Sequence, residues 1–152
     1  GVNDLRVSRM LGRVPHPYTR YHAKAYLPGA RRNARAGKSL TLSIFRDGRL
    51  IGGTSVARLP DYCEFGYWLA HDAWGRGYAT EAGAAVLAYA FEVLGLRQIR
   101  SGVFAGNTAS LRVQTKLGFR RIGVGRRMAL AQGRTVEHID TVLTRRRFEA
   151  LQ

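Results

Sequence analysis

Apolar and polar residues repeat with two different periods along the chain, and the alternation between these periods predicts a mixed α/β fold. Period-two alternation in SLTLSIFRDGRLIGGTSVARL (39–59) predicts two strands joined at Asp47-Gly48, which is a strong hairpin signal. YCEFGYWLA (62–70) and RQIRSGVFA (97–105) predict two further strands. A last pair of strands is expected on either side of Gln132-Gly133.

Helices are predicted between these strands. The segment 14–38 reads as a helix with Thr19 as its N-cap and a break at Pro28-Gly29. A second helix follows residue 78, where apolar residues return every three or four positions until Gly95. NTASLRVQTKLG (107–118) predicts a third, from an asparagine N-cap to a terminal glycine.

Length and composition limit the classes of protein to which the chain can belong. The 152 residues, 45% of them hydrophobic, suit one globular domain. No stretch approaches the ~20 apolar residues of a membrane span, and no signal-peptide pattern opens the chain. Cys63 is the only cysteine, which excludes an internal disulfide and favours a reducing cytoplasm.

The net charge of +15 predicts an anionic partner, such as a phosphate-bearing cofactor, nucleic acid, a ribosome surface or an acidic protein. Much of the excess lies in GARRNARAGK (29–38) and in the clusters Arg126-Arg127 and 145–147. Two interpretations of these clusters stay open, a solvated surface and a binding surface.

WGRGYATEA (74–82) places two glycines between a predicted strand and a predicted helix. The first amides of a helix lack partners and carry the positive end of its dipole, so phosphate is their usual ligand. Gly75 and Gly77 remove the β-carbons that would hold an anion away from these amides, and they accept the backbone angles of a concave nest. The pattern therefore predicts a pyrophosphate site.

Other interpretations of this loop depend on spacing. A dinucleotide fingerprint needs a third glycine at position 80, which is Thr80, and an acidic residue about 20 positions further on. A Walker loop needs glycine at position 32, which is Arg32, ahead of the GKS at 37–39. Neither pattern is met. An ordinary tight turn would also use two glycines, and the loop alone leaves that interpretation open.

Two stretches, YWLAHDAWGRGYATEA (67–82) and NTASLRVQTKLGF (107–119), together resemble the GNAT superfamily of acetyl-coenzyme A dependent N-acetyltransferases, over about 40–144. The resemblance is closest to the branch that acetylates the N-terminal alanine of ribosomal proteins. The acyl-CoA loop motif is met by Gly77 and Ala79, and the second motif by Asn107, Ser110, Lys116, Gly118 and Phe119.

The resemblance implies a single acetyltransferase domain over 1–152, with a mixed, mostly antiparallel sheet flanked by helices. Three features depart from the family pattern. Trp74 replaces the leading Gln or Arg of the acyl-CoA loop, and Gln114 replaces a tyrosine that acts as the acid in many members. Residues 1–13 barely supply the superfamily's first strand.

The resemblance also implies a set of site residues. Those expected to bind acetyl-CoA are Trp68, Leu69, Trp74, Gly75, Arg76, Gly77, Tyr78, Ala79, Thr80 and Asn107. Backbone N-H groups near Tyr67 to Leu69 would polarise the thioester oxygen where the strand parts from its neighbour, and Gly66 would fit a local bulge there. Asn107 has a second explanation as a helix cap.

The catalytic candidates are Glu64, as a base acting through water, and Ser110, as the acid in place of the missing tyrosine. An exposed carboxylate balancing nearby arginines is an equal interpretation of Glu64. Tyr67 and His138 are the candidate substrate contacts, and His71 either touches the ligands or caps a turn. The spacing of the histidines suggests no metal site, and the reaction needs neither metal nor covalent intermediate.

The chemistry favours a protein N-terminus as acceptor, because an α-amino group with pKa ~7.7 to 8.0 is roughly a tenth uncharged at pH 7, against about one part in 2,500 for lysine. Small amines stay open as acceptors. The alternative function is a basic RNA-binding or ribosome-binding module on the same fold without catalysis. The chain is expected to work away from membranes, as a monomer or homodimer.

Overall fold

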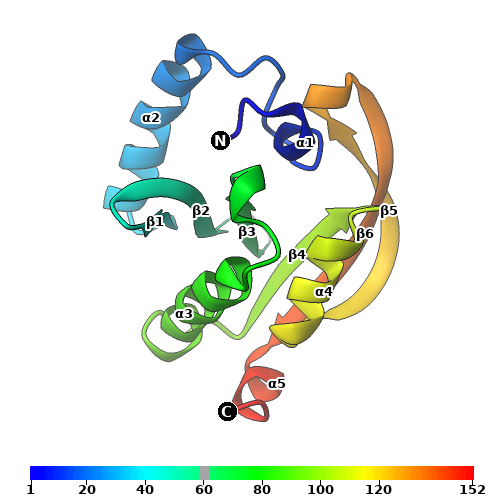
Figure 1. The fold of residues 1–152 in the computed structure, drawn as a ribbon. Coiled ribbons are helices and arrows are strands. Elements are labelled where there is room, and N and C mark those ends of the chain that lie inside the picture. The colour runs from blue at the N-terminus through cyan, green and yellow to red at the C-terminus, as the bar shows by residue number, and fades with distance from the viewer. Residues whose placement is uncertain (59–61) are drawn as a thin grey trace.

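The computed structural model describes residues 1–58 and 62–152, which form a mixed fold of helices and strands (Figure 1). The helices are α1 (Leu5–Ser8), α2 (Arg20–Arg35), α3 (Tyr78–Glu92), α4 (Thr108–Lys116) and α5 (Arg145–Glu149), with the 3₁₀ turns η1 (His71–Ala73) and η2 (Leu130–Gln132). The strands are β1 (Ser39–Arg46), β2 (Arg49–Arg58), β3 (Cys63–Leu69), β4 (Gln98–Phe104), β5 (Arg120–Ala129) and β6 (Arg134–Thr144). Within these ranges, no helix is long and apolar enough to cross a membrane.

All six strands belong to one sheet with the order β1-β2-β3-β4-β6-β5. Neighbouring strands are antiparallel except β3 and β4, which are parallel and, among the described residues, pair only at Glu64 with Arg100. Beyond that pair β3 and β4 separate toward their carboxyl ends, whereas β3 stays paired with β2 along its length. The predicted mixed, mostly antiparallel sheet flanked by helices is therefore confirmed.

The hairpin between β1 and β2 turns as predicted. Asp47 and Gly48 both have positive φ, 48° and 75°, which is the backbone of a tight two-residue hairpin turn. The predicted second strand reached Leu59, which lies outside the described residues. Gly95 and Gly118, expected at the ends of helices, follow α3 and α4 with φ of 68° and 93°.

The predicted break at Pro28-Gly29 is wrong, because α2 continues through it from Arg20 to Arg35. Proline removes one backbone donor, but no residue of α2 is buried, so water can satisfy the carbonyl that is left without a partner. The helix begins at the predicted N-cap, Thr19, whose N-H donates to Nδ1 of His22 at 3.1 Å.

The predicted bulge at Gly66 is also wrong. Gly66 pairs with Ser55 in an unbroken register between β2 and β3. The separation from β4 therefore comes from the loss of pairing on the other edge of β3. Residues 1–13, all of them described, contain α1 and no strand, which agrees with the expectation that they barely supply a first strand.

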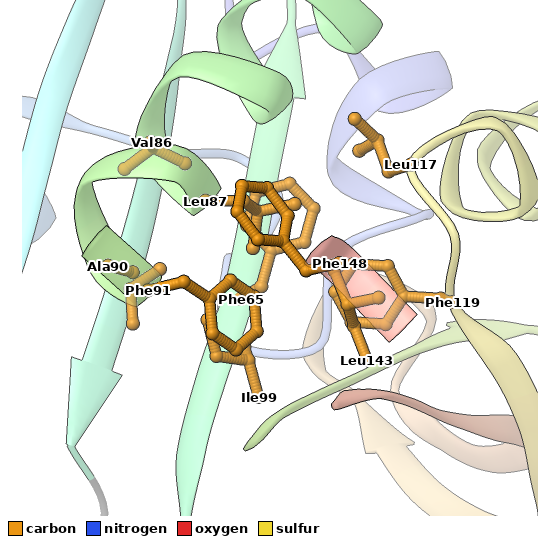
Figure 2. Close-up of a cluster of buried hydrophobic side chains, with 11 residues drawn as sticks. Phe65, Val86, Leu87, Ala90, Phe91, Ile99, Leu117, Phe119, Leu143 and Phe148 are labelled. Atoms are coloured by element: carbon orange, nitrogen blue, oxygen red, sulfur yellow. The ribbon is translucent and has the colours of Figure 1, made fainter. Parts of the chain in front are cut away.

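The core lies between the sheet and α3, with α4 and α5 closing its sides. Figure 2 shows the phenylalanine rings gathered among aliphatic side chains from α3, β4 and β6. Phe65 stacks on Phe119 with ring centroids 5.6 Å apart, and Phe91 stacks on Phe148 at 4.9 Å. Each of these rings is at least 93% buried, so the core fixes β3 against the helices.

A buried polar network holds α4 to the sheet beside the parting strands. The side chain of Gln114, which is 2% exposed, donates from Nε2 to Ser101 Oγ at 2.8 Å and to the Gly102 carbonyl at 3.2 Å. Its Oε1 accepts from the hydroxyl of Thr141 at 2.7 Å, and Ser101 Oγ donates to the Phe65 carbonyl at 2.9 Å. The network therefore links α4, β3, β4 and β6.

Replacing Gln114 with leucine should lower the free energy of unfolding by about 1–3 kcal/mol, because the buried hydroxyls of Ser101 and Thr141 would each lose a partner. Urea denaturation of both proteins measures this difference. The matched control is Gln98→Leu, at an exposed position on β4, which should change stability by less than about 0.5 kcal/mol. Equal stabilities of the two variants would contradict the role given to the network.

Candidate active site

The glycine loop connects β3 to the amino end of α3. Gly75 and Gly77 have φ of 73° and 85°, and a β-carbon built on either would meet nothing within 4 Å. Open space beside both glycines leaves room for a ligand against the main chain. Gly77 is the N-cap of α3 and offers no side chain to its amides.

The amides at the start of α3 divide into two groups. The N-H groups of Thr80 and Glu81 donate to the Gly77 carbonyl, at 2.9 and 3.0 Å. Within the described chain, the amides of residues 76–79 have no such backbone partner. The free donors therefore lie from Arg76 to Ala79, and Thr80 can offer a ligand only its hydroxyl.

Trp74 secures the loop by its side chain. The indole Nε1 donates to the Leu69 carbonyl at 2.9 Å, across the loop, and the indole packs on the His71 ring with centroids 4.8 Å apart. His71 therefore supports the loop from η1, which agrees with the turn interpretation of this residue. Trp74 replaces a polar side chain of the motif and instead closes the loop.

Arginines surround a cavity of about 400 Å³ beside this loop, lined by Arg46, Asp47, Arg49, Ile51, Asp72, Ala73, Arg76 and Tyr78. The Arg46 guanidinium lies over the Tyr78 ring, 5.5 Å from its centroid. Arg49 pairs with Asp72 at 2.6 Å, and the hydrogen bond from Arg49 lowers the pKa of that carboxyl. Arg46 is likewise paired with Asp47, at 3.3 Å, so the net positive charge of the lining comes from Arg76, which makes this side of the loop suitable for an anion.

Tyr67 and Ser110 meet where β3 has left β4. The Tyr67 hydroxyl and Ser110 Oγ are 2.7 Å apart, and Asn107 Oδ1 accepts from the Ser110 N-H at 3.1 Å. Burial raises the pKa of the Tyr67 hydroxyl above its ordinary value, and the bond to Ser110 offsets part of the rise. Asn107 is thus a helix cap that also orients Ser110.

The edge of β3 that faces β4 carries main-chain N-H groups available to a ligand, whereas the Leu69 carbonyl already accepts from Trp74 Nε1. The Phe65 carbonyl points toward β4, since it accepts from Ser101. Because main-chain groups alternate in direction along a strand, those of Tyr67 and Leu69 point the same way. In the described part of the chain, neither residue is paired with β4.

Glu64 lies on the opposite face of the sheet from Tyr67. Its carboxylate accepts from Arg13 Nη2 at 2.7 Å and is 34% exposed. Trp68 shares that face by strand alternation, and its ring stands beside Gly53 and Gly1. The structure therefore separates the two catalytic candidates, Glu64 and Ser110, onto opposite sides of β3.

His138 lies two strands away on the same face as Glu64. Residues paired across neighbouring strands share a face of the sheet. Glu64 pairs with Arg100 and His138 pairs with Phe104. Arg100 and Phe104 are four residues apart on β4 and therefore lie on the same face, which is also the face of Glu64 and His138. The His138 ring is 16% exposed and occupies the space over Gly102, where a β-carbon would collide with it.

The His138 ring is held by a carboxylate. His138 Nδ1 lies 2.9 Å from Asp140 Oδ1, which also accepts from Arg127 at 3.2 Å. A hydrogen bond at Nδ1 fixes the ring and leaves Nε2 free for a ligand. The sequence predicts that Asp140 alternates with His138 on one strand, which puts both side chains on one face, but it gives Asp140 no role.

Comparison with known proteins settles the family. The family model described as Acetyltransferase (GNAT) domain matches residues 2–120. This chain belongs to the GNAT acetyltransferase family. The GNAT match includes the glycine loop, β3 and β4, and the whole of α4, which together hold most of the predicted site residues.

Individual relatives agree with this assignment. The uncharacterized N-acetyltransferase YoaA of Bacillus subtilis is 36% identical over 83 residues, which are 55% of this chain and 47% of YoaA. YdaF of the same species, named as a candidate ribosomal N-acetyltransferase, is 30% identical over 108 residues, 69% of this chain and 59% of YdaF. This GNAT chain spans about half the length of the curated relatives that it matches.

A solved structure has the same fold over nearly the whole chain. Mycobacterium smegmatis RimJ in complex with CoA-disulfide superposes with a TM-score of 0.81 at 25% identity, covering 98% of this chain and 79% of RimJ. CoA-disulfide is therefore a ligand of a protein with this fold. The bare amides from Arg76 to Ala79 and the open space at Gly75 and Gly77 fit such a diphosphate.

Several residues that surround the candidate site could not be found from sequence. Arg13 is 51 positions from Glu64, and Arg46 and Arg49 reach the glycine loop only through the β1-β2 hairpin. Tyr78 and Ala79 do lie where predicted, at the start of α3, but Ala79 is 8% exposed and packs in the core, so only its backbone can contact a ligand.

Gly77→Glu should abolish binding of acetyl-CoA at micromolar concentrations, because a carboxylate would stand among the free amides and repel the diphosphate. Isothermal titration of wild type and variant measures this. Gly37→Glu is the matched control, since Gly37 also has positive φ, 66°, and open space around its α-carbon. Unchanged affinity in Gly77→Glu would remove the loop from the ligand site.

Proposed function

We propose that this chain transfers an acetyl group from acetyl-CoA to a primary amine, preferentially the α-amino group of a protein or peptide N-terminus. The observation that carries the proposal is the single pairing of β3 with β4, which opens the sheet edge directly beside the free amides of the glycine loop. An open edge admits the pantetheine arm, and the amides bind the diphosphate. The activity is that of one domain over residues 1–152, since β5 and β6 complete the same sheet beyond the family match.

Acetyl-CoA supplies an activated thioester when bound, and the residues of this chain orient it and move the protons. The edge amides of Tyr67 and Leu69 polarise the thioester oxygen. Glu64 removes a proton from the incoming amine through a water molecule, on the face opposite Ser110. Ser110, at the first turn of α4, donates a proton to the sulfur as the carbon-sulfur bond breaks.

The acceptor site lies on the face that carries Glu64. His138, held by Asp140, lines it with Nε2 free to contact the peptide. Strand alternation gives the enzyme one face for each substrate, with Tyr67 and Ser110 on the acetyl-CoA side. The amine and the thioester then meet through the gap between β3 and β4.

The preference for an N-terminus has two supports. A site with one candidate base, Glu64, manages an α-amino group, roughly a tenth uncharged at pH 7, more easily than a lysine. The relative YdaF is named as a candidate ribosomal N-acetyltransferase, which favours ribosomal proteins as the class of acceptor. The single free thiol, Cys63, supports a reducing, cytoplasmic location.

A second candidate function is binding of RNA without catalysis. Residues 5–46 contain ten arginines and lysines and no acidic residue, and α2 has no buried residue. Arginines exposed along one helix fit a phosphate backbone. This surface also fits an acetyltransferase that works on the ribosome, so it does not exclude catalysis.

A panel of peptides with different first residues, alongside polyamines and aminoglycosides, tests the proposal by release of free thiol from acetyl-CoA. Peptides with a free N-terminus should release thiol faster than the same peptides with a blocked N-terminus and a free lysine. A protein that releases no thiol with any amine, ignores acetyl-CoA and binds RNA with steep salt dependence would support the second candidate instead.

Glu64→Gln should lower kcat/KM for the amine by roughly 10²-fold or more and flatten its dependence on pH, because glutamine cannot accept a proton. Affinity for acetyl-CoA should stay within about twofold, since Glu64 lies on the other face of β3. Glu92→Gln, an exposed position at the end of α3, is the matched control. A wild-type pH profile in Glu64→Gln would remove this residue as the base.

A further inference from the structure

The two hydroxyls of Tyr67 and Ser110 form a preorganised pair. They lie 2.7 Å apart, although the residues are 43 positions apart in the chain. The Tyr67 ring packs against Phe65 and between the two core clusters, and the Ser110 backbone is fixed by Asn107. Both partners are therefore held in place before any substrate binds.

Gln114 cannot supply the acid that this fold position provides when it is a tyrosine. An amide has no proton to give at neutral pH. The Gln114 side chain is also committed on every side, since its nitrogen donates to Ser101 and Gly102 and its oxygen accepts from Thr141. The proton for the leaving group must therefore come from another side chain.

Serine alone is a poor proton source for this reaction. The leaving group is a thiolate, and thiols have pKa values near about 8.5, whereas an aliphatic hydroxyl is a far weaker acid. A phenol, with a pKa of about 10, is much closer to the thiol. A proton passed from Tyr67 through Ser110 therefore leaves the negative charge on a phenolate and not on an alkoxide.

We propose that Tyr67 takes the place of the missing tyrosine by feeding a proton through Ser110 to the sulfur of the departing coenzyme A. This inference rests on the proposed acetyl transfer. The amine nitrogen forms its bond to the acetyl carbon and loses a proton through water to Glu64, while the carbon-sulfur bond breaks and leaves its electron pair on sulfur. The Ser110 proton moves to that sulfur, the Tyr67 proton moves to Ser110 Oγ, and water returns a proton to the phenolate.

The surroundings of Tyr67 agree with this role. Burial raises the pKa of Tyr67, so the hydroxyl is protonated at neutral pH and is a weaker acid than an exposed phenol, although it is still a far stronger acid than the aliphatic hydroxyl of Ser110. The sequence analysis placed Tyr67 among the substrate contacts, whereas the structure places its hydroxyl on Ser110. Tyr67 acts through Ser110 and is therefore a positioning residue, while Ser110 is the group that touches the sulfur.

The test is single-turnover release of thiol from acetyl-CoA, with a peptide that has an N-terminal alanine as acceptor. Tyr67→Phe should lower the rate roughly 10–100-fold, with affinity for acetyl-CoA within about twofold of wild type. Tyr89→Phe, at an exposed tyrosine of α3, is the matched control and should keep the wild-type rate. Ser110→Thr, which keeps a hydroxyl, should recover most of the rate lost in Ser110→Ala.

A double-mutant cycle separates the relay from two independent effects. The variant with both Tyr67→Phe and Ser110→Ala should be no more than about twofold slower than Ser110→Ala alone, because one broken link already interrupts the relay. Additive losses in the double variant would overturn the inference. So would a wild-type rate in Tyr67→Phe.

A measurement on the wild-type protein keeps the inference testable if Tyr67→Phe does not fold. The measurement is the rate of thiol release in mixtures of H₂O and D₂O. If two protons move together, a plot of the rate against the deuterium fraction of the solvent should be curved, and a straight line would overturn the relay. A wild-type protein that releases no thiol with any amine would overturn the proposed function and the relay together. Release by wild type with an unaffected Tyr67→Phe would overturn the relay alone.

Discussion

The hydrogen bond from Ser101 to the Phe65 carbonyl, held in place by Gln114, is the constraint on which the rest of the site depends. It lies one residue beyond Glu64 with Arg100, the single backbone pair between β3 and β4 in the described chain, and the two strands separate after it. A buried polar network of this kind is stable only if every member is satisfied, and in the described chain no buried side-chain donor or acceptor lacks a partner. The place where the sheet opens is therefore fixed by side chains from four elements.

The opening divides β3 into two working faces. Tyr67 turns toward α4 and Ser110, on the side of the glycine loop, while Glu64 turns toward Arg13 and the face shared with His138. Tyr67 is three positions from Glu64 in the chain and is hydrogen-bonded to Ser110, yet strand alternation places the candidate acid and the candidate base on opposite sides of β3. This arrangement suits a reaction in which two substrates meet through a gap between strands.

The family assignment and the local chemistry support each other without depending on each other. The GNAT match covers residues 2–120, and the free amides of the loop and the open space at Gly75 and Gly77 follow from backbone geometry alone. Where the chain departs from the family pattern, the structure supplies a reason. The indole of Trp74 closes the loop by a hydrogen bond to the Leu69 carbonyl. Gln114 stands where many family members have an acidic tyrosine, and its amide instead holds α4 to the sheet.

The sequence by itself determined the elements whose causes are local: the Asp47-Gly48 hairpin, the Thr19 and Asn107 caps, and the glycine loop at the head of α3. Local rules were not enough at Pro28 and Gly66, because solvent exposure of α2 tolerates a proline and an intact register with β2 leaves no bulge. Only the tertiary structure decided which side chains meet. The pair Tyr67 with Ser110, the pair Glu64 with Arg13 and the network around Gln114 join residues far apart in the chain, and such contacts are set by how strands and helices pack, which no local pattern encodes.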